Sequence, residues 1–237
     1  MRALLLFTFC CITITSNSQT QYAGWLATFN TFKTGKKMSI HNDIQWRSTD
    51  ELRHTQTFLF RVGLNYKINK LMTVTGGYAF VHNRRTVSSV TGFAPEHRIW
   101  EQLLIPQKWK RLLITHRFRL EQRFVSKSAV VNNELENTGS AYSNRFRYFL
   151  RNILPLRKEA KFERGPFLAL QNEVFLNFGN RANVNGKYFD QNRFYLAAGY
   201  RVDAKLDIEL GFLNQYIHGR TNDVSNQALQ VATYVRL

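Results

Sequence analysis

Arginine recurs at every second position in several segments of this sequence, a spacing that suits carboxylate pairing or anion binding. Between positions 112 and 124, Arg117, Arg119 and Glu121 alternate with the apolar Phe118 and Leu120. Successive residues of a β-strand point to opposite faces of its sheet, so each segment would have one charged and one apolar face. The residues predicted to form charged rows in the lumen of a barrel are Arg117, Arg119, Glu121, Arg123, Arg145, Arg147, Arg151, Glu173, Arg193 and Arg201.

Two interpretations of these rows follow from their chemistry. In the commoner one, arginines and carboxylates on neighbouring strands form a structural ladder of bidentate hydrogen bonds. In the other, the surplus of arginine over acid meets water or an anion, because an unpaired buried guanidinium is costly. An anion-preferring conduit or a site for an acidic ligand would use that surplus. The residues expected to contribute most are Arg117, Arg119, Arg145 and Arg147.

The strands that would carry these rows are long. From Met38 to Arg47, apolar residues occupy one parity and polar residues the other. A strand of a soluble protein usually has about five or six residues, whereas a tilted crossing of a bilayer needs about 9–11. An apolar outer face with a polar interior is typical of a transmembrane β-barrel. The predicted strands are 22–32, 38–47, 55–67, 71–83, 96–106, 112–124, 143–154, 166–178, 190–202, 205–216 and 227–237.

The predicted fold is all-β: a single transmembrane antiparallel up-and-down β-barrel of 10–12 strands with a narrow charged lumen. Eleven strands would leave the termini at opposite ends, and bacterial single-chain barrels have even strand numbers. We favour ten over twelve, because segment 22–32 alternates weakly. Short turns are predicted to face the periplasm and longer polar loops the outside. The short turns are 67–70, 107–111, 156–165 and 203–205, and the loops are 84–95, 125–142, 179–189 and 217–226.

The first eighteen residues are typical of a cleaved signal peptide. Arg2 precedes a mostly apolar stretch, and Ser16 and Ser18 supply the small residues that signal peptidase needs, so we expect residues 1–18 to be removed and residues 19–237 to form the barrel. The apolar stretch is too short for a membrane-spanning helix. Cys10 and Cys11 both lie in this leader, so disulfides and cysteine-based metal sites are excluded from the remaining chain. The expected location is the outer membrane of a Gram-negative bacterium.

The net charge of the chain and the pattern of its last predicted strand indicate which partners to expect. The chain has 33 Lys and Arg against 16 Asp and Glu, a net charge of +17. Much of the arginine lies at period two within strands rather than on a helix or arm, so we expect no nucleic-acid partner. Segment 227–237 is amphipathic, ends in Leu237, and resembles the signal by which outer-membrane proteins are recognised by the barrel assembly machinery. That machinery, outer-membrane lipids and lipopolysaccharide are the predicted partners.

Three arginine- and glutamate-rich segments resemble one protein family. They are 96–102 (EHRIWEQ), 115–124 (THRFRLEQRF) and 144–151 (NRFRYFLR), and Trp25 and the tripeptide at 45–47 (QWR) are similar to the opening of the same family. It is the family called domain of unknown function 2490, typical of Bacteroidota. The resemblance implies an outer-membrane β-barrel, and it implies no activity or substrate, because none is established for the family.

No recognisable catalytic motif is present. The sequence has no G-x-S-x-G, H-E-x-x-H or P-loop motif, and its six histidines lack metal-ligand spacing, so we predict no catalytic residue, metal or cofactor. The alternative function is an outer-membrane lipid-modifying enzyme of the phospholipase or lipid A deacylase type. Such an enzyme would need a serine and a histidine within hydrogen-bond reach on the outer surface, and the sequence identifies no such pair.

Overall fold

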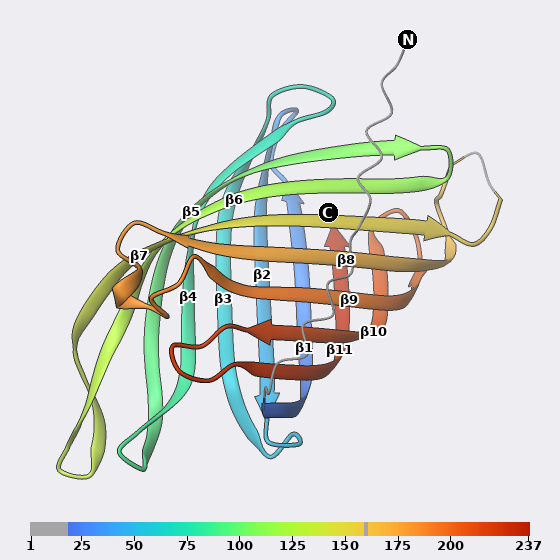
Figure 1. Cartoon of the computed structure of the whole chain (residues 1–237). Helices are drawn as coiled ribbons and strands as arrows, with labels where there is room; N and C mark the ends of the chain where they lie inside the picture. Colours follow the sequence, from blue (N-terminus) through green and yellow to red (C-terminus); the bar gives the residue numbers. More distant parts are fainter. Residues whose placement is uncertain (1–18, 159–160) are drawn as a thin grey trace.

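A computed structural model describes residues 19–158 and 161–237, which form a closed β-barrel (Figure 1). The leader predicted at residues 1–18 lies outside the described residues. Within them, no helix is long and apolar enough to cross a membrane. The strands are β1 (Gln19–Lys33), β2 (Met38–Thr49), β3 (His54–Lys67), β4 (Thr73–Val87), β5 (Val90–Trp109), β6 (Leu112–Val131), β7 (Glu134–Pro155), β8 (Gly165–Phe178), β9 (Phe189–Arg201), β10 (Leu206–Ile217) and β11 (Val224–Arg236), with one 3-10 turn, η1 (Arg181–Asn183).

The barrel is closed by a parallel pair of strands. Each strand pairs in antiparallel fashion with its neighbour in the chain, whereas β1 and β11 run in the same direction, from Gln19 opposite Val224 to Thr31 opposite Arg236. The predicted all-β barrel of 10–12 strands is confirmed, but the expectation of an even number, ten or twelve, is wrong, because the described residues form eleven strands. In an odd up-and-down series the first and last strands must be parallel, and their hydrogen bonds remove both sheet edges.

Two segments predicted as loops are instead continuous with strands. Segment 84–95 forms the ends of β4 and β5, and segment 125–142 forms the ends of β6 and β7. Each hairpin turns through two residues with positive φ, Ser88 and Ser89 in one and Asn132 and Asn133 in the other, as two-residue hairpins of type I′ require. Both hairpins project beyond the neighbouring strands (Figure 1). Their serine, asparagine, glycine and threonine content is typical of loops, and their apolar residues, such as Val90 and Phe93, do not keep to one parity.

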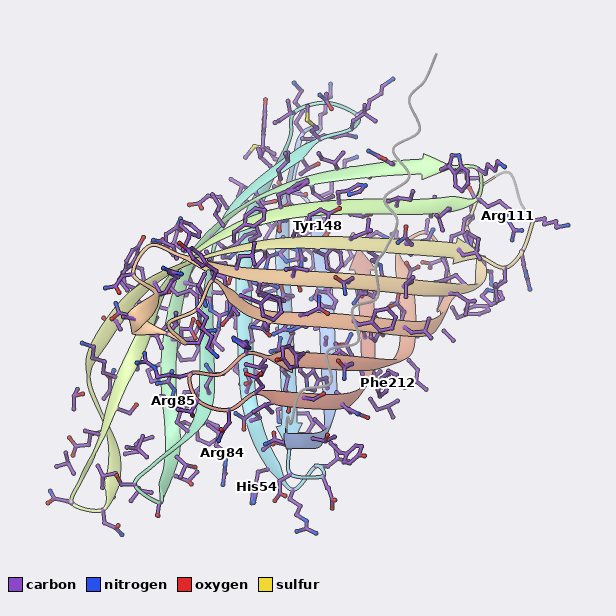
Figure 2. The ribbon with its side chains drawn as sticks, in the orientation of Figure 1. His54, Arg84, Arg85, Arg111, Tyr148 and Phe212 are labelled. Atoms are coloured by element: carbon purple, nitrogen blue, oxygen red, sulfur yellow. The ribbon has the colours of Figure 1, made fainter. Side chains whose placement is uncertain are left out.

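The two ends of the barrel differ. One end, here the hairpin end, carries the turns at 50–53, 88–89 and 132–133 and the loops at 179–188 and 218–223. The opposite end carries the connections at 34–37, 68–72, 110–111, 156–164 and 202–205. All four predicted short turns lie at this opposite end, as expected. Figure 2 shows Arg84 and Arg85 towards the hairpin end and Arg111 at the other.

Alternate residues of most strands separate into a buried set, which mixes charged side chains with apolar ones such as Phe167 and Ala197, and an exposed set that is largely apolar. On β6, Arg119 and Glu121 are each 1% exposed, whereas Leu120 between them is 43% exposed. Outward-pointing apolar residues recur around the barrel, for example Leu64 on β3, Leu210 on β10 and Leu229 on β11. This differs from a soluble barrel, because many charged side chains lie in the interior and apolar side chains cover the outside.

Glycines make room for the largest interior ring. Trp100 of β5 is fully buried. It lies against the backbone of Gly63 on β3 and Gly77 on β4, where an added Cβ would come within 2.7 Å and 2.6 Å of the indole ring. Gly63 and Gly77 are cross-strand partners, so together they form a flat backbone surface against which the indole packs. The guanidinium of Arg119 lies over the same ring, 4.5 Å from its centroid.

Candidate anion site in the barrel lumen

Glu121 on β6 is the centre of the largest ion-pair cluster. Its carboxylate accepts hydrogen bonds from Arg145 Nε at 3.0 Å and Nη2 at 2.6 Å, and from Arg147 Nη1 at 2.5 Å. Both arginines belong to β7, where Arg145 is the register partner of Glu121. Because Glu121 is buried, these charge-assisted bonds replace the water that its carboxylate loses.

Glu173 on β8 continues the same ladder. Its Oε1 accepts from Arg147 Nη2 at 2.7 Å and from Arg117 Nη2 at 2.6 Å. Arg147 therefore bridges Glu121 and Glu173 across three strands. Glu173 lies directly opposite Arg193 in the register between β8 and β9, yet no hydrogen bond or ion pair joins these two residues.

The other buried carboxylates of the described residues also have arginine partners. Arg61 donates to Asp43 at 3.0 Å, Arg98 and Arg123 share Glu96, and Arg145 also reaches Asp190 at 2.8 Å. Arg151 pairs with Glu209, and Asp207 binds Arg201 and Arg236. Several carboxylates thus serve two arginines, so the interior keeps a surplus of positive charge.

The predicted arginines differ in whether a carboxylate lies close enough to pair with them. Arg117, Arg145 and Arg147, three of the four that we expected to matter most for an anion, have carboxylate partners at 2.5–2.8 Å. Arg119 donates mainly to Gln102 Oε1, at 2.7 and 3.1 Å, and lies 3.9 Å from Glu121. The geometry of these residues fits the structural ladder better than a free anion site.

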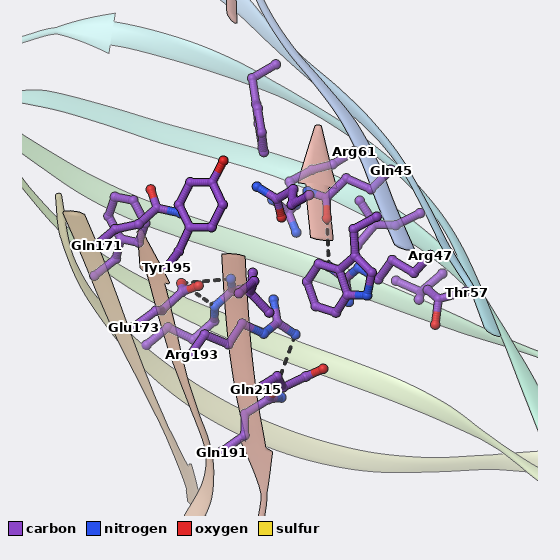
Figure 3. A pocket seen from close by; sticks show the side chains of 18 of the residues that line it. Gln45, Arg47, Thr57, Arg61, Gln171, Glu173, Gln191, Arg193, Tyr195 and Gln215 are labelled. Atoms are coloured by element: carbon purple, nitrogen blue, oxygen red, sulfur yellow. Dashed lines mark hydrogen bonds and ion pairs between the residues drawn. The ribbon is translucent and has the colours of Figure 1, made fainter. Parts of the chain in front are cut away.

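Arg193 on β9 and Arg47 on β2 differ from the residues of the ladder. Among the described residues, no carboxylate lies within 4.0 Å of either guanidinium. Both lie over the indole of Trp25 on β1, at 4.1 Å for Arg47 and 5.3 Å for Arg193. Figure 3 shows the two arginines pointing towards a common space from different walls. We call Trp25, Arg47 and Arg193 the lumen triad.

The lumen triad lines a cavity of about 800 Å³ inside the barrel. The walls of this cavity include Thr49 and Arg85 near the hairpin end and Thr31 and Arg236 near the opposite end. Along β1 alone they run from Gln21 to Thr31, and ten residues of strand rise about 33 Å. Residues near both ends of the barrel therefore line this cavity.

The sequence identified one residue of the lumen triad, Arg193, as a lumen row residue, but not Arg47 or Trp25. Arg47 occupies the polar parity of its strand, which was the available signal, but it was not among the predicted row residues. Trp25 lies in the segment that we expected not to be a full strand. The three residues come from β1, β2 and β9, and their proximity depends on barrel closure and on the register between strands distant in sequence.

In the described part of the chain, the histidine ring nitrogens contact tyrosine hydroxyls or aspartates: Tyr78 by His97, Tyr148 by His116, and Asp43 by His41. No hydrogen bond there joins a serine hydroxyl to a histidine, and no three His, Cys, Asp or Glu side chains are grouped as metal ligands.

Outside the strands, Asp223 lies at the mouth of the hairpin end. Its carboxylate accepts a hydrogen bond from the Tyr216 hydroxyl at 2.5 Å and lies 3.1 Å from His218. The hydrogen bond from Tyr216 holds the pKa of the Asp223 carboxyl below its ordinary value. This loop therefore keeps a negative charge at the hairpin end of the barrel.

Comparison with known proteins shows the family of the chain. Among solved structures, the siderophore receptor PirA from Pseudomonas aeruginosa is similar at 10% identity with a TM-score of 0.30; the match covers 78% of this chain and 32% of that receptor, so the chain spans about a third of the receptor's length. No curated protein matches the chain. Residues 23–226 match the profile of the family described as "Protein of unknown function (DUF2490)", and the chain therefore belongs to this family.

Proposed function

We propose that the protein is an outer-membrane β-barrel of a Gram-negative bacterium, of the Bacteroidota type, and that its lumen conducts small solutes with a preference for anions. The apolar outer surface and strands of 12 to 22 residues support a membrane location, since a tilted crossing needs only about 9–11. In this arrangement the short connections face the periplasm and the two long hairpins project outside.

One observation carries the anion preference: the elongated cavity is lined by arginines that outnumber its carboxylates, and Arg47 and Arg193 have no carboxylate within 4.0 Å among the described residues. Rings of arginine or lysine select negative ions in pores. The field in a low-dielectric channel acts over its length, so paired arginines that share one carboxylate also contribute.

The proposal includes the route to the membrane. Residues 1–18 would be removed as a signal peptide, and the amphipathic β11 would bind the barrel assembly machinery. Lipids and lipopolysaccharide would then contact the apolar outer face and the basic rim at Arg84 and Arg85. Cell fractionation tests this location: the protein should be found in outer membranes and give a heat-modifiable band on a gel. Recovery as a soluble periplasmic protein would contradict it.

Ion selectivity tests the conduit. Purified protein in planar bilayers under a KCl gradient should show a reversal potential of the sign expected for chloride, and replacing both Arg47 and Arg193 by glutamine should move it towards zero. For comparison, Arg84→Gln removes one cavity-lining arginine near the rim and keeps the lumen triad, so it should move the reversal potential less. Absence of conductance, or cation preference, would refute the conduit; phospholipid hydrolysis by the same preparation would favour the enzyme alternative.

A further inference from the structure

We propose that the lumen triad is a binding site for a small oxyanion carrying two negative charges, with phosphate or a phosphomonoester as the best-matched class. The inference rests on the proposed function in one respect, because the ligand would reach the site through the lumen. It goes further because it names a discrete binding site and a class of ligand. An anion preference that arises from charge along a channel requires neither a binding site nor a particular ligand.

The hydrogen-bond donors of the two arginines are mostly unused. Arg47 Nη2 donates to Gln45 Oε1 at 2.6 Å, and Arg193 Nη2 donates to Gln191 Oε1 at 3.1 Å. The Nε atom of each arginine is buried without a hydrogen-bond partner. A guanidinium has five N–H donors, so both groups retain several donors for a ligand with many acceptor oxygens. The buried Nε atoms are closed off from the cavity, so the Nη groups supply the donors that a ligand in the cavity would meet.

Neighbouring amides hold the two guanidinium groups in place. Gln45 Nε2 donates to Asp43 at 2.9 Å, which turns Gln45 Oε1 towards Arg47. Gln215 Nε2 donates to Gln191 Oε1 at 2.5 Å on the side of Arg193. Arg193 also lies 4.7 Å from the ring centroid of Phe175, in addition to its contact with Trp25. The site is therefore preorganised, which lowers the entropic cost of binding.

The charge of the site favours a dianion. Two guanidinium groups contact one indole ring, and the carboxylate opposite Arg193, Glu173, is already bound by Arg147 and Arg117. A monoanion would neutralise only one of the two positive charges. A phosphomonoester carries about −1.5 to −2 at pH 7 and presents three acceptor oxygens. Its tetrahedral oxygens can face two guanidinium groups at once, whereas a planar carboxylate matches the fork of one.

Binding can be measured without any conductance. The probe is inorganic phosphate, added to detergent-solubilised protein at constant ionic strength with chloride as the balancing anion. We expect saturable quenching of tryptophan fluorescence, because Trp25 is in the site, and a rise of the unfolding temperature of about 3–6 °C at ten times Kd. Arg47→Gln and Arg193→Gln should each weaken phosphate binding about 10- to 100-fold, since each removes charged hydrogen bonds.

Three comparisons make the test specific. Arg84→Gln should bind phosphate like the unaltered protein, because Arg84 lines the cavity outside the triad. Arg47→Lys keeps the charge without the planar donors and should bind more weakly than the unaltered protein but more strongly than Arg47→Gln. Acetate at equal ionic strength should give little shift. A heat-modifiable band must first show that each variant is folded.

The outcomes separate this inference from the proposed function. Phosphate binding that depends on the triad supports the site, even if bilayers show no conductance and the conduit fails. Anion-selective conductance without phosphate binding supports the conduit and refutes the site. An equal response of all variants to phosphate, or equal effects of acetate and phosphate, would also refute a dianion site at the triad.

Discussion

At the residue scale, the consecutive residues Arg119 and Leu120 lie in opposite environments, the first inside the barrel and the second on its outer face. Arg119 is buried over Trp100 and bonded to Gln102, and its Nη1 has no hydrogen-bond partner. Leu120 points outwards. Since the side-chain period of a strand is two, a shift of one residue would exchange these environments for the whole of β6.

Substitution at these two positions should therefore have unequal effects. An arginine on the lipid face near the bilayer midplane costs about 2–4 kcal/mol, so Leu120→Arg should lower the yield of folded barrel in membranes. Arg119→Leu should lower it less, because it removes a buried charge that lacks a close carboxylate. The amount of heat-modifiable protein in outer membranes measures both effects. The reverse order would show that β6 presents its other face to lipid.

At the scale of elements, glycines in β3 and β4 make room for the indole ring of Trp100. Gly63 and Gly77 allow Trp100 to lie against the sheet, and Trp100 in turn supports Arg119. The neighbouring Gly76 lies on the other face of β4, where an added Cβ would meet nothing within 4 Å. Two consecutive glycines in one strand thus have different roles.

This pair gives a matched test of packing. Gly77→Ala would place a methyl group against the Val62 carbonyl oxygen and 2.6 Å from the Trp100 ring, so we expect it to destabilise the barrel by about 1–3 kcal/mol, as overpacking does. Gly76→Ala should be neutral or stabilise by up to about 1 kcal/mol, because alanine loses less backbone entropy than glycine. Urea unfolding followed by tryptophan fluorescence compares the two. Equal destabilisation by the two substitutions would mean that Trp100 does not pack against Gly77.

For the whole molecule, the decisive feature is the parallel contact of β1 with β11. This contact closes the barrel and brings Trp25 into the same cavity as Arg193. Leu26 and Val231 are register partners across it, and both point outwards. Adjacent strands lie about 4.7–4.9 Å apart, which is within the Cα separation that a disulfide can span.

A designed disulfide can test closure. In a background with Cys10→Ser and Cys11→Ser, the pair Leu26→Cys and Val231→Cys should oxidise within one chain and give a faster-migrating band on a non-reducing gel. The control pair, Leu26→Cys with Leu120→Cys, joins β1 to the distant β6 and should stay reduced within the monomer. Failure of the first pair to crosslink in folded protein would argue against the parallel closure.

The sequence by itself determined the local features of this protein. Alternation of residue types placed one strand on each of the eleven predicted segments and separated Arg119 from Leu120, because strand periodicity depends only on neighbouring residues. It also located the four short turns. It misjudged the segments 84–95 and 125–142, where apolar and polar residues do not alternate regularly.

Only the tertiary structure decided the strand number, the closure and the identity of the unpaired arginines. Arg147 and Arg193 look alike in sequence, since both occupy polar parities. Arg147 lies between Glu121 and Glu173, whereas Arg193 and Arg47 meet the indole of Trp25. Which carboxylate a long guanidinium side chain reaches depends on strand register and on distances across the lumen. These are set by the closed sheet as a whole, and no local sequence pattern records them.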